Sequence, residues 1–368
     1  MSASHTIVGK QRLPVAIRTI VRDIAETARG RTFTLMEVCG THTVSILRSG
    51  IRLLLPSTLR LVSGPGCPVC VTPVSYIDRL IAYARMKNTI IATFGDLMRV
   101  PGSRSSLRRE KSRGADVRLI YSPLESLALA GSEPLKKVIL AAVGFETTTP
   151  AVAACAIEAR ARGLNNFFIL SGGRMIPPAM DALLKGGSKI DGFLCPGHVS
   201  VVIGTRPYER IARIYKVPCV IAGFEPLDIL LAVRELTEMI AAGKSGVRNL
   251  YPRAVEPGGN PKARRATETV FRAGDAEWRG LGVIPRSGYF LRKEFQDFDA
   301  GRMLPVSVQP AGDNPRCRCG DVLTGTIEPP DCPAFARRCS PDHPLGPCMV
   351  SSEGTCAAWF AYRIIIPS

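Results

Sequence analysis

Residues 138–171 read VILAAVGFETTTPAVAACAIEARARGLNNFFILS and contain, in one stretch, the repeating unit of the fold. The runs VILAAV and FFIL, within the strands predicted at Val138–Val143 and Asn166–Ser171, are continuously apolar. Runs of this kind are typical of strands buried on both faces. The segment Pro150–Arg162 between them is predicted to be a helix. A strand, a helix and a second strand in this order predict a βαβ unit with parallel strands.

The same alternation extends over the first two thirds of the chain. Six further strands are predicted, at Phe33–Cys39, Arg60–Ser63, Thr89–Phe94, Val117–Tyr121, Asp191–Cys195 and Cys219–Ala222. Further helices are predicted at Val74–Met86 and Pro226–Ala242, and one at about Pro14–Arg29 precedes the first strand. The predicted fold class is therefore α/β with parallel sheets.

The motifs that follow these strands have a similar layout in two halves of the chain. VCGTHT (38–43), GPGCPVC (64–70) and TFGD (93–96) are followed by VGFETTTP (143–150), LCPGHVS (194–200) and AGFEP (222–226). We interpret this layout as a weak internal duplication and expect two similar α/β domains that face a cleft, at 1–128 and 129–245. After about residue 245, proline, glycine and arginine increase and cysteines appear. This change predicts a small irregular domain at 246–368, stabilised by a metal.

Composition restricts the class of protein. The chain has 368 residues, of which 46% are hydrophobic and 21% charged, as expected of a soluble globular protein with a sizeable core. It has no apolar run of 18 or more residues, so we expect no membrane span. The first residues, MSASH, lack the basic and apolar segments of a secretory signal. We therefore expect a cytoplasmic protein.

The formal net charge of +17 permits binding to nucleic acid or to an acidic partner. The densest basic stretch, 99–118, holds seven Lys and Arg residues against two acids. It lacks the interleaved aromatic residues on which bases stack, and no nucleic-acid motif accompanies it. A solvated basic loop and helix is the better interpretation, and nucleic acid is not an expected partner.

Polar motifs follow almost every predicted strand, and ligand sites of open α/β sheets lie beyond the carboxyl ends of the strands. Cys39 and His42, on the turn Cys-Gly-Thr-His, would suit either a nucleophile–base pair or a two-ligand metal site. Cys67 and Cys70 form a C-x-x-C turn. Such a turn favours reversible thiol chemistry, whereas half of a zinc site would need a second pair that the chain lacks.

Two further motifs are ambiguous when taken alone. Glu146, in GFETTTP, is compatible with an ordinary helix N-terminus and with a substrate site at that N-terminus. His198, in PGHVS, suits either a loop histidine or a site residue. However, the chain has only four histidines, and both His42 and His198 follow predicted strands. We therefore include Glu146 and His198 among the candidate catalytic residues.

The tail holds six of the twelve cysteines within the last 52 residues. In a reducing compartment such a group indicates metal binding or thiol chemistry rather than structural disulfides. Cys317, Cys332, Cys339 and Cys356 have the spacing C-x14-C-x6-C-x16-C, and four thiolates suit a 4Fe–4S cluster or a structural zinc. The absence of two short knuckles favours the cluster. Cys319 is an alternative to Cys317 as a ligand, and Cys348 an expected bystander.

Taken together, the motifs resemble those of the HypD family, maturation factors of nickel–iron hydrogenases. The resemblance runs from about residue 30 to 362. It rests on VCGTHT, GPGCPVC, FGDLMRVPGS, VGFETTTP, CPGHVS, AGFEPLDIL, YPRAVEPGGNPKARR, WRGLGVIPRSGY and CMVSSEGTCAAW. It implies two α/β domains, a 4Fe–4S domain, and a scaffold formed with the small chaperone HypC on which iron receives cyanide and carbon monoxide. It also implies a cyanide donor, HypE, which carries a thiocyanate on its C-terminal cysteine.

The resemblance assigns roles to particular residues. Cys39 would hold the iron with His42 as its neighbour, Cys67 and Cys70 would be the thiol/disulfide pair, and the tail cysteines would bind the cluster. The chain departs from the family at Gly173, where a histidine is expected. The resulting hypothesis is an assembly scaffold in which a 4Fe–4S cluster supplies electrons through Cys67 and Cys70. The alternatives are a stand-alone cluster-coupled thiol/disulfide reductase and a zinc-stabilised nucleic-acid-binding protein.

Overall fold

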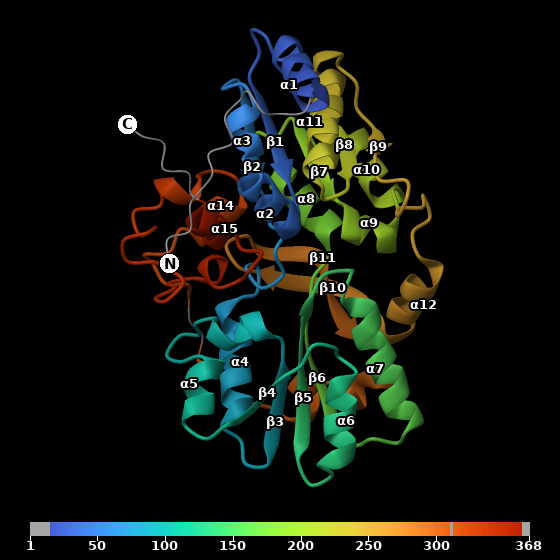
Figure 1. The fold of residues 1–368 in the computed structure, drawn as a ribbon. Coiled ribbons are helices and arrows are strands. Elements are labelled where there is room, and N and C mark those ends of the chain that lie inside the picture. Colours follow the sequence, from blue (N-terminus) through green and yellow to red (C-terminus); the bar gives the residue numbers. More distant parts are fainter. Residues whose placement is uncertain (1–14, 310–311, 363–368) are drawn as a thin grey trace.

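The computed structural model describes residues 15–309 and 312–362. It contains two parallel sheets, one antiparallel hairpin and a C-terminal region of short helices and loops (Figure 1). Residues 1–14, with Pro14 of the first predicted helix, lie outside the described residues. None of the described helices is long and apolar enough to cross a membrane.

Sheet A has five parallel strands in the order β2 (Leu59–Ser63), β1 (Phe33–Glu37), β7 (Gly192–Pro196), β8 (Cys219–Ala222) and β9 (Val247–Asn249). Sheet B has four parallel strands in the order β4 (Asp116–Leu119), β3 (Thr89–Thr93), β5 (Lys137–Gly144) and β6 (Phe167–Gly173). The prediction of an α/β fold with parallel sheets is confirmed.

The two sheets share one strand order but are not formed by consecutive halves of the chain. Number the strands of each sheet in the order in which they occur along the chain. In both sheets the first four then lie side by side in the order 2-1-3-4. The expected boundary between residues 128 and 129 falls between β4 and β5, inside sheet B, and does not separate the two sheets. The chain leaves sheet A after β2, builds all of sheet B and then returns at β7. Motif order along the chain cannot reveal such a return.

Helices cover both sheets. Around sheet A lie α1 (Val15–Thr27), α2 (Gly40–Arg48), α3 (Ile51–Leu54), α8 (Ile176–Lys185), α9 (Gly197–Ile203), α10 (Arg206–Tyr215) and α11 (Pro226–Ala241). Around sheet B lie α4 (Val74–Ala84), η2 (Gly95–Arg99), α5 (Leu107–Ser112), α6 (Glu125–Ser132) and α7 (Thr149–Ala161). The central strands β3, β5 and β8 are almost entirely buried, as their continuous apolar sequences predict.

The chain after sheet A adds α12 (Pro261–Val270) and the antiparallel hairpin of β10 (Phe271–Trp278) and β11 (Gly282–Leu291), which lies between the two sheets (Figure 1). Further elements are η3 (Lys293–Phe298), α13 (Ala300–Met303), α14 (Cys319–Leu323), η4 (Pro329–Asp331), η5 (Pro347–Met349) and α15 (Thr355–Tyr362). The sequence analysis missed the hairpin because glycine, proline and charged residues interrupt its strands and its burial does not alternate regularly.

The C-terminal region has little regular structure, but it is held to the rest of the protein by specific contacts. Arg52 of α3 forms an ion pair with Glu328, and its guanidinium lies 4.7 Å from the centre of the Trp359 ring. Arg99 donates to the carbonyls of Pro341 and Val350 at 3.4 and 3.2 Å. The region therefore contacts elements of both sheets.

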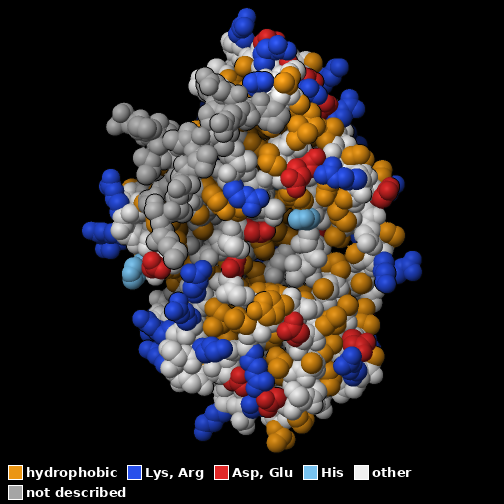
Figure 2. All heavy atoms as spheres, in the orientation of Figure 1, with side chains coloured by type: hydrophobic (Ala, Val, Ile, Leu, Met, Phe, Trp, Pro, Cys, Tyr) orange, Lys and Arg blue, Asp and Glu red, His pale blue; other side chains and the backbone are white. Residues whose placement is uncertain are grey.

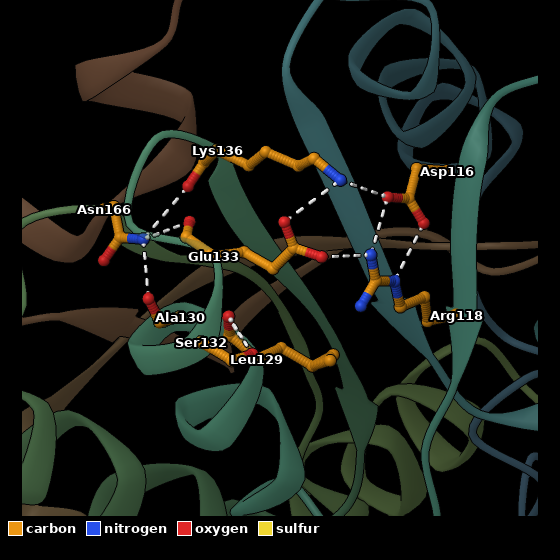
Figure 3. A network of polar contacts seen from close by, with 8 residues as sticks. All are labelled: Asp116, Arg118, Leu129, Ala130, Ser132, Glu133, Lys136 and Asn166. Carbon is orange, nitrogen blue, oxygen red and sulfur yellow. Dashed lines mark hydrogen bonds and ion pairs between the residues drawn. The ribbon is translucent and has the colours of Figure 1, made fainter.

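Part of the charge in and near the basic stretch is paired with carboxylates within the fold. In Figure 3, Arg118 of β4 binds both Asp116 and Glu133, and Lys136 contacts the same two carboxylates. The amide of Asn166 donates to the carbonyl of Ala130 in α6 and to those of Glu133 and Lys136 in the loop after it, and so fixes the start of β6. Lys and Arg side chains are spread over the face drawn in Figure 2 and do not form one stripe. This arrangement agrees with a solvated basic surface.

Candidate functional site

The candidate residues of sheet A gather where its strand order reverses, between β1 and β7. Cys39 is the second residue after β1, the C-x-x-C turn follows β2, and Gly197 and His198 follow β7. Such a reversal leaves a crevice at the carboxyl ends of the strands, where ligands of open α/β sheets bind. The sheet therefore brings together motifs that lie far apart in the sequence.

Cys39 is the N-cap residue of α2, and its side chain is 8% exposed. Its backbone N–H donates to Oε2 of Glu37 at 3.1 Å, and the hydroxyl of Thr43 donates to the other oxygen of the same carboxyl group. Burial raises the pKa of the Cys39 thiol to about 12 and that of Glu37 to about 8. The thiol is therefore protonated at neutral pH until a cation replaces the proton.

The C-x-x-C turn packs directly against Cys39. The N–H of Gly40 donates to the carbonyl of Gly66 at 3.1 Å. A Cβ on Gly66 would lie 2.2 Å from the backbone nitrogen of Cys39, so only glycine permits this approach. Cys67 and Cys70 form a disulfide and are both buried. The structure thus holds a buried disulfide one residue away from the Cys39 contact.

His42 lies fully buried in α2 and is part of an aromatic stack. Its Nε2 lies 2.8 Å from the carbonyl oxygen of Gly223, whereas its Nδ1 has no hydrogen-bond partner among the residues that the structure describes. Burial lowers the pKa of His42 to about 4, so the ring is neutral at pH 7. The ring of Phe224 lies 4.8 Å from His42 and 4.0 Å from His198, between centroids. His198 is exposed, so the stack connects the buried histidine with solvent.

Glu146 follows β5 in sheet B and is buried, with 4% of its surface exposed. The N–H of Ile176, at the start of α8, donates to its Oε1 at 3.0 Å, and its Oε2 has no hydrogen-bond partner in the described part of the chain. Burial raises the pKa of Glu146 to about 7. Besides this bond to α8, the side chains of Tyr208 in α10 and Tyr289 in β11 interact electrostatically with its carboxyl group. A Cβ on the neighbouring Gly173 would meet Cδ2 of Tyr289 at 3.0 Å, so the hairpin occupies the space of a side chain there.

A pocket of about 360 Å³ lies between the carboxyl edge of sheet B, the disulfide turn and the C-terminal region. Its lining includes Pro68 and Val69 from inside the disulfide ring, Asp96, Thr148 and Glu353. The pocket therefore places the disulfide turn, which follows a strand of sheet A, beside side chains of sheet B and of the C-terminal region.

The segment Ser351–Glu353 connects the sheets and was missed by the sequence analysis. Asp96 accepts hydrogen bonds from the hydroxyls of Ser351 and Ser352 and from the Ser352 N–H, at 3.0 to 3.1 Å. The hydroxyl of Thr41 donates to Oε1 of Glu353 at 2.8 Å, beside Cys39. The sequence did contain a signal for Glu353, because this acid lies between Cys348 and Cys356 in the motif CMVSSEGTC.

The six tail cysteines gather in one place. Cys356 lies beside Cys317, Cys339 and Cys348, and Cys332 lies in a small apolar cluster with Cys339 and Cys356. The sulfurs of Cys319 and Cys348 are 2.7 Å apart. Hydrogen bonds from the thiols of Cys317 and Cys348 lower the pKa of Cys319 well below its usual range. Cys319 and Cys348 therefore form a close pair, which the sequence analysis did not foresee.

The four predicted ligands suit the predicted cluster in the chemistry of their donor atoms. Cys317, Cys332, Cys339 and Cys356 are thiols, the donors that iron–sulfur clusters require, and all four belong to the gathered group. Within residues 15–309 and 312–362, no group of three or more His, Cys, Asp or Glu side chains is already arranged to hold a metal ion.

Comparisons with known proteins extend over most of the chain. A family model described as "Hydrogenase formation hypA family", with the short name HypD, matches residues 15–363. The chain is 46% identical over 349 residues to "Hydrogenase maturation factor HypD" of Azotobacter vinelandii, which covers 93% of this chain and 92% of that protein. It is 44% identical over 364 residues to the protein of the same name from Escherichia coli (strain K12), which covers 97% and 98%.

Proposed function

Because the chain belongs to the HypD family, we propose that it is a hydrogenase maturation factor on which the iron group of a nickel–iron hydrogenase is assembled. The observation that supports this proposal most strongly is the contact between a buried thiol, Cys39, and a buried disulfide turn at the switch point of sheet A. The names of the related proteins support the general role. The following steps are proposals from the chemistry of the residues.

Iron is the cargo of this proposed scaffold, and Cys39 is its ligand. Thiolates are soft donors that make a bound iron electron-rich, which favours cyanide and carbon monoxide as further ligands. The raised pKa of Cys39 means that iron displaces a proton when it binds. We propose that a HypC-like chaperone supplies a second thiolate to the iron, as the family resemblance implies.

Cyanide transfer from a HypE-like thiocyanate requires two electrons. The sulfur–carbon bond breaks, the donor cysteine leaves as a thiolate and cyanide binds the iron. A dithiol at Cys67 and Cys70 supplies these electrons by forming the observed disulfide, and it releases two protons. One disulfide therefore forms for each cyanide delivered, and it must be reduced before the next transfer.

The tail provides the route for this reduction. A 4Fe–4S cluster held by Cys317, Cys332, Cys339 and Cys356 supplies single electrons when bound. Cys319 and Cys348 belong to the same buried apolar cluster as Cys67 and Cys70. We propose that this close pair passes electrons in twos to the disulfide, which joins a one-electron donor to a two-electron reaction.

We assign proton transfer to Glu146 and His198, and the orientation of a ligand to His42. The pKa of about 7 allows Glu146 to hold or release a proton near neutral pH. Neutral His42 presents an unpaired Nδ1, which can accept a hydrogen bond from a ligand beside Cys39. His198 lies at the exposed end of the stack, where it can exchange protons with solvent. The thiol chemistry requires a reducing compartment, so we propose a cytoplasmic location.

The test compares Cys39→Ala with Cys155→Ala in cells that lack their own HypD protein. Both thiols are buried with a pKa raised to about 12, but Cys155 lies in α7, away from the site. We expect Cys39→Ala to abolish hydrogenase activity and the infrared bands of iron-bound cyanide and carbon monoxide. Cys155→Ala should retain both. Full maturation by Cys39→Ala would refute the scaffold role.

The runner-up is a stand-alone thiol/disulfide reductase, which is favoured by the two close cysteine pairs. It would reduce a small disulfide substrate, such as oxidised glutathione, at the same rate with and without the small chaperone. The scaffold predicts no turnover of such a substrate by the purified chain. A steady rate that Cys39→Ala leaves unchanged would favour the reductase.

A further inference from the structure

The sulfurs of the proposed site are shielded from solvent. Cys39 is 8% exposed, and Cys67 and Cys70 are 3% and 0% exposed. The nearby pocket of about 360 Å³ is lined by Pro68 and Val69 of the disulfide turn, but the two cysteines are not part of its lining. A donor molecule cannot reach these sulfurs in the closed arrangement, so part of the wall around them must move before a reaction.

Residues 351–354 of the tail, which we call the lid, cover this site. A Cβ on Gly40 would lie 2.5 Å from the Cβ of Glu353 and 2.6 Å from its carbonyl oxygen, so the lid touches the residue after Cys39. Three residues of the lid also line the pocket. The lid is therefore the part of the tail that closes over both the Cys39 turn and the pocket beside the disulfide.

One carboxylate oxygen holds the lid on sheet B. Oδ2 of Asp96, in η2 beyond the carboxyl end of β3, accepts hydrogen bonds from the hydroxyls of Ser351 and Ser352 at 3.0 and 3.1 Å and from the Ser352 N–H at 3.0 Å. On the side of sheet A, the hydroxyl of Thr41 donates to Oε1 of Glu353 at 2.8 Å. Asp96 thus accepts most of the hydrogen bonds that fix the lid, and bonds to a carboxylate are stronger than bonds to a neutral acceptor.

The contact between the lid and Asp96 is small and polar. The lid reads Ser-Ser-Glu-Gly and has no apolar side chain, so hydrophobic burial contributes little to holding it in place. Asp96 is half-buried and Ser352 is exposed, so water can replace the hydrogen bonds between them. Segments that are held mainly by solvent-accessible hydrogen bonds open locally at a low cost in free energy.

We propose that Asp96 is a positioning residue that holds the lid closed over Cys39 and the disulfide, and that release of this contact admits the donor of the transferred group. Among the described residues Asp96 has no hydrogen bond to Cys39 or to the disulfide turn, so it acts through the lid. In the closed state the lid excludes water from the site. This inference deepens the proposed function and rests on it only for the identity of the donor, a thiocyanate-bearing protein.

The test measures how fast an uncharged phosphine, tris(hydroxypropyl)phosphine, reduces the Cys67–Cys70 disulfide in the full chain, purified without oxygen. The released thiols are trapped with N-ethylmaleimide and identified by mass spectrometry. Because the disulfide reacts from the open state, the rate follows the fraction of chains with an open lid. We expect Asp96→Ala to raise this rate about tenfold. Asp96→Asn keeps an acceptor oxygen and should raise it less.

Two controls separate an open lid from a loosened protein. Asp78 accepts hydrogen bonds from the N–H of Ser103, at 2.8 Å, and from its hydroxyl, within the part of the chain that builds sheet B. Asp78→Ala therefore removes a similar contact and should leave the rate unchanged. Cys155, fully buried in α7, reports on unfolding of sheet B in the same samples. N-ethylmaleimide should trap it no faster in Asp96→Ala than in the wild type.

A second variant keeps the proposal testable if Asp96→Ala does not fold. Ser352→Ala removes one hydroxyl bond to Asp96 and should raise the reduction rate about two- to threefold. The proposal is overturned if neither variant changes the rate, or if Asp78→Ala raises it as much. It is also overturned if trapping of Cys155 accelerates in proportion, because the variants would then loosen the whole fold. Iron retention at Cys39 is measured independently of these rates and tests the proposed function separately.

Discussion

The Cys39 site and the tail cysteines reach the same kind of chemistry by opposite structural means. Cys39 stands at the end of a buried parallel strand, and backbone hydrogen bonds, a glycine contact and the Glu37 carboxylate hold it in place. The tail thiols lie in loops and short helices with a small apolar core of their own. In the proposed function, the first site is organised before iron arrives, whereas the second would depend on the metal that it binds.

This difference follows from how each region pairs the N–H and C=O groups of its backbone. In sheet A every central strand is paired on both sides, so the loops that follow the strands have fixed ends. The tail has no sheet, and its helices α14 and α15 are five and eight residues long. Helices this short are not stable alone, and a metal bound by several thiolates can hold together a region whose core is thin.

The largest expected effect is a loss of folded structure in the tail, the region with less regular structure. Cys356→Ser removes the thiol at the centre of the tail group and should leave residues 312–362 without a stable fold, while β5 and β6 keep theirs. Hydrogen exchange read by mass spectrometry should show protection lost in the tail and retained in sheet B. His343→Ala, an exposed change in the same region, should alter neither. Equal protection of the tail in both variants would mean that the metal does not stabilise it.

Next in size is the effect of a buried carboxyl group in sheet B. The pKa of Glu146 is about 7 in the fold and about 4.5 when exposed. Between these values the folded state holds a proton that the unfolded chain has released, so stability falls as pH rises and is then constant. At 1.36 kcal/mol per pKa unit, this amounts to about 3 kcal/mol.

The neutral variant Glu146→Gln should therefore match the wild type below about pH 4.5 and gain stability relative to it up to about pH 7. Urea unfolding at a series of pH values measures the difference. If the difference in free energy of unfolding between the variant and the wild type is constant across this range, Glu146 is not protonated in the fold. Its carboxyl group would then not be in the water-excluded site beside sheet B.

A smaller effect tests the preorganisation of the Cys39 site. Gly66→Ala places a methyl group against the backbone of Cys39, which cannot move without breaking the sheet contact. We expect a loss of about 2 kcal/mol in the free energy of unfolding. Gly131→Ala is the matched control, because its Cβ meets nothing within 4 Å in helix α6, and it should stabilise the protein slightly. A neutral Gly66→Ala would contradict the close packing of the disulfide turn on Cys39.

The smallest effect concerns the link between the two regions. Thr41→Val removes the hydrogen bond to Glu353 and should cost about 1 kcal/mol. If the tail depends on its metal more than on this contact, cluster content should be unchanged in the variant. A loss of cluster iron together with the small loss of stability would show instead that the Cys39 region helps to organise the tail.

The sequence predicted the strands far better than their arrangement. All eight predicted strands are present, because buried parallel strands are continuous apolar runs that can be recognised locally. The interleaving of the two sheets was missed, since a strand sequence such as that of β5 does not indicate which sheet it joins. The surroundings of Cys39 show the same limit, because contacts between distant parts of the chain cannot be recognised locally. Gly66 lies within a recognisable motif, but Glu353 comes from more than 300 residues away along the chain.

The most direct test of the central claim is an iron and acid-labile sulfide analysis of protein purified without oxygen, for the wild type, Cys39→Ala and Cys155→Ala. We predict about four iron and four sulfide per chain in all three, the composition of a 4Fe–4S cluster. The wild type and Cys155→Ala should hold additional iron that Cys39→Ala lacks. One zinc and no sulfide in the wild type, or additional iron that Cys39→Ala retains, would contradict the account of two separate metal sites.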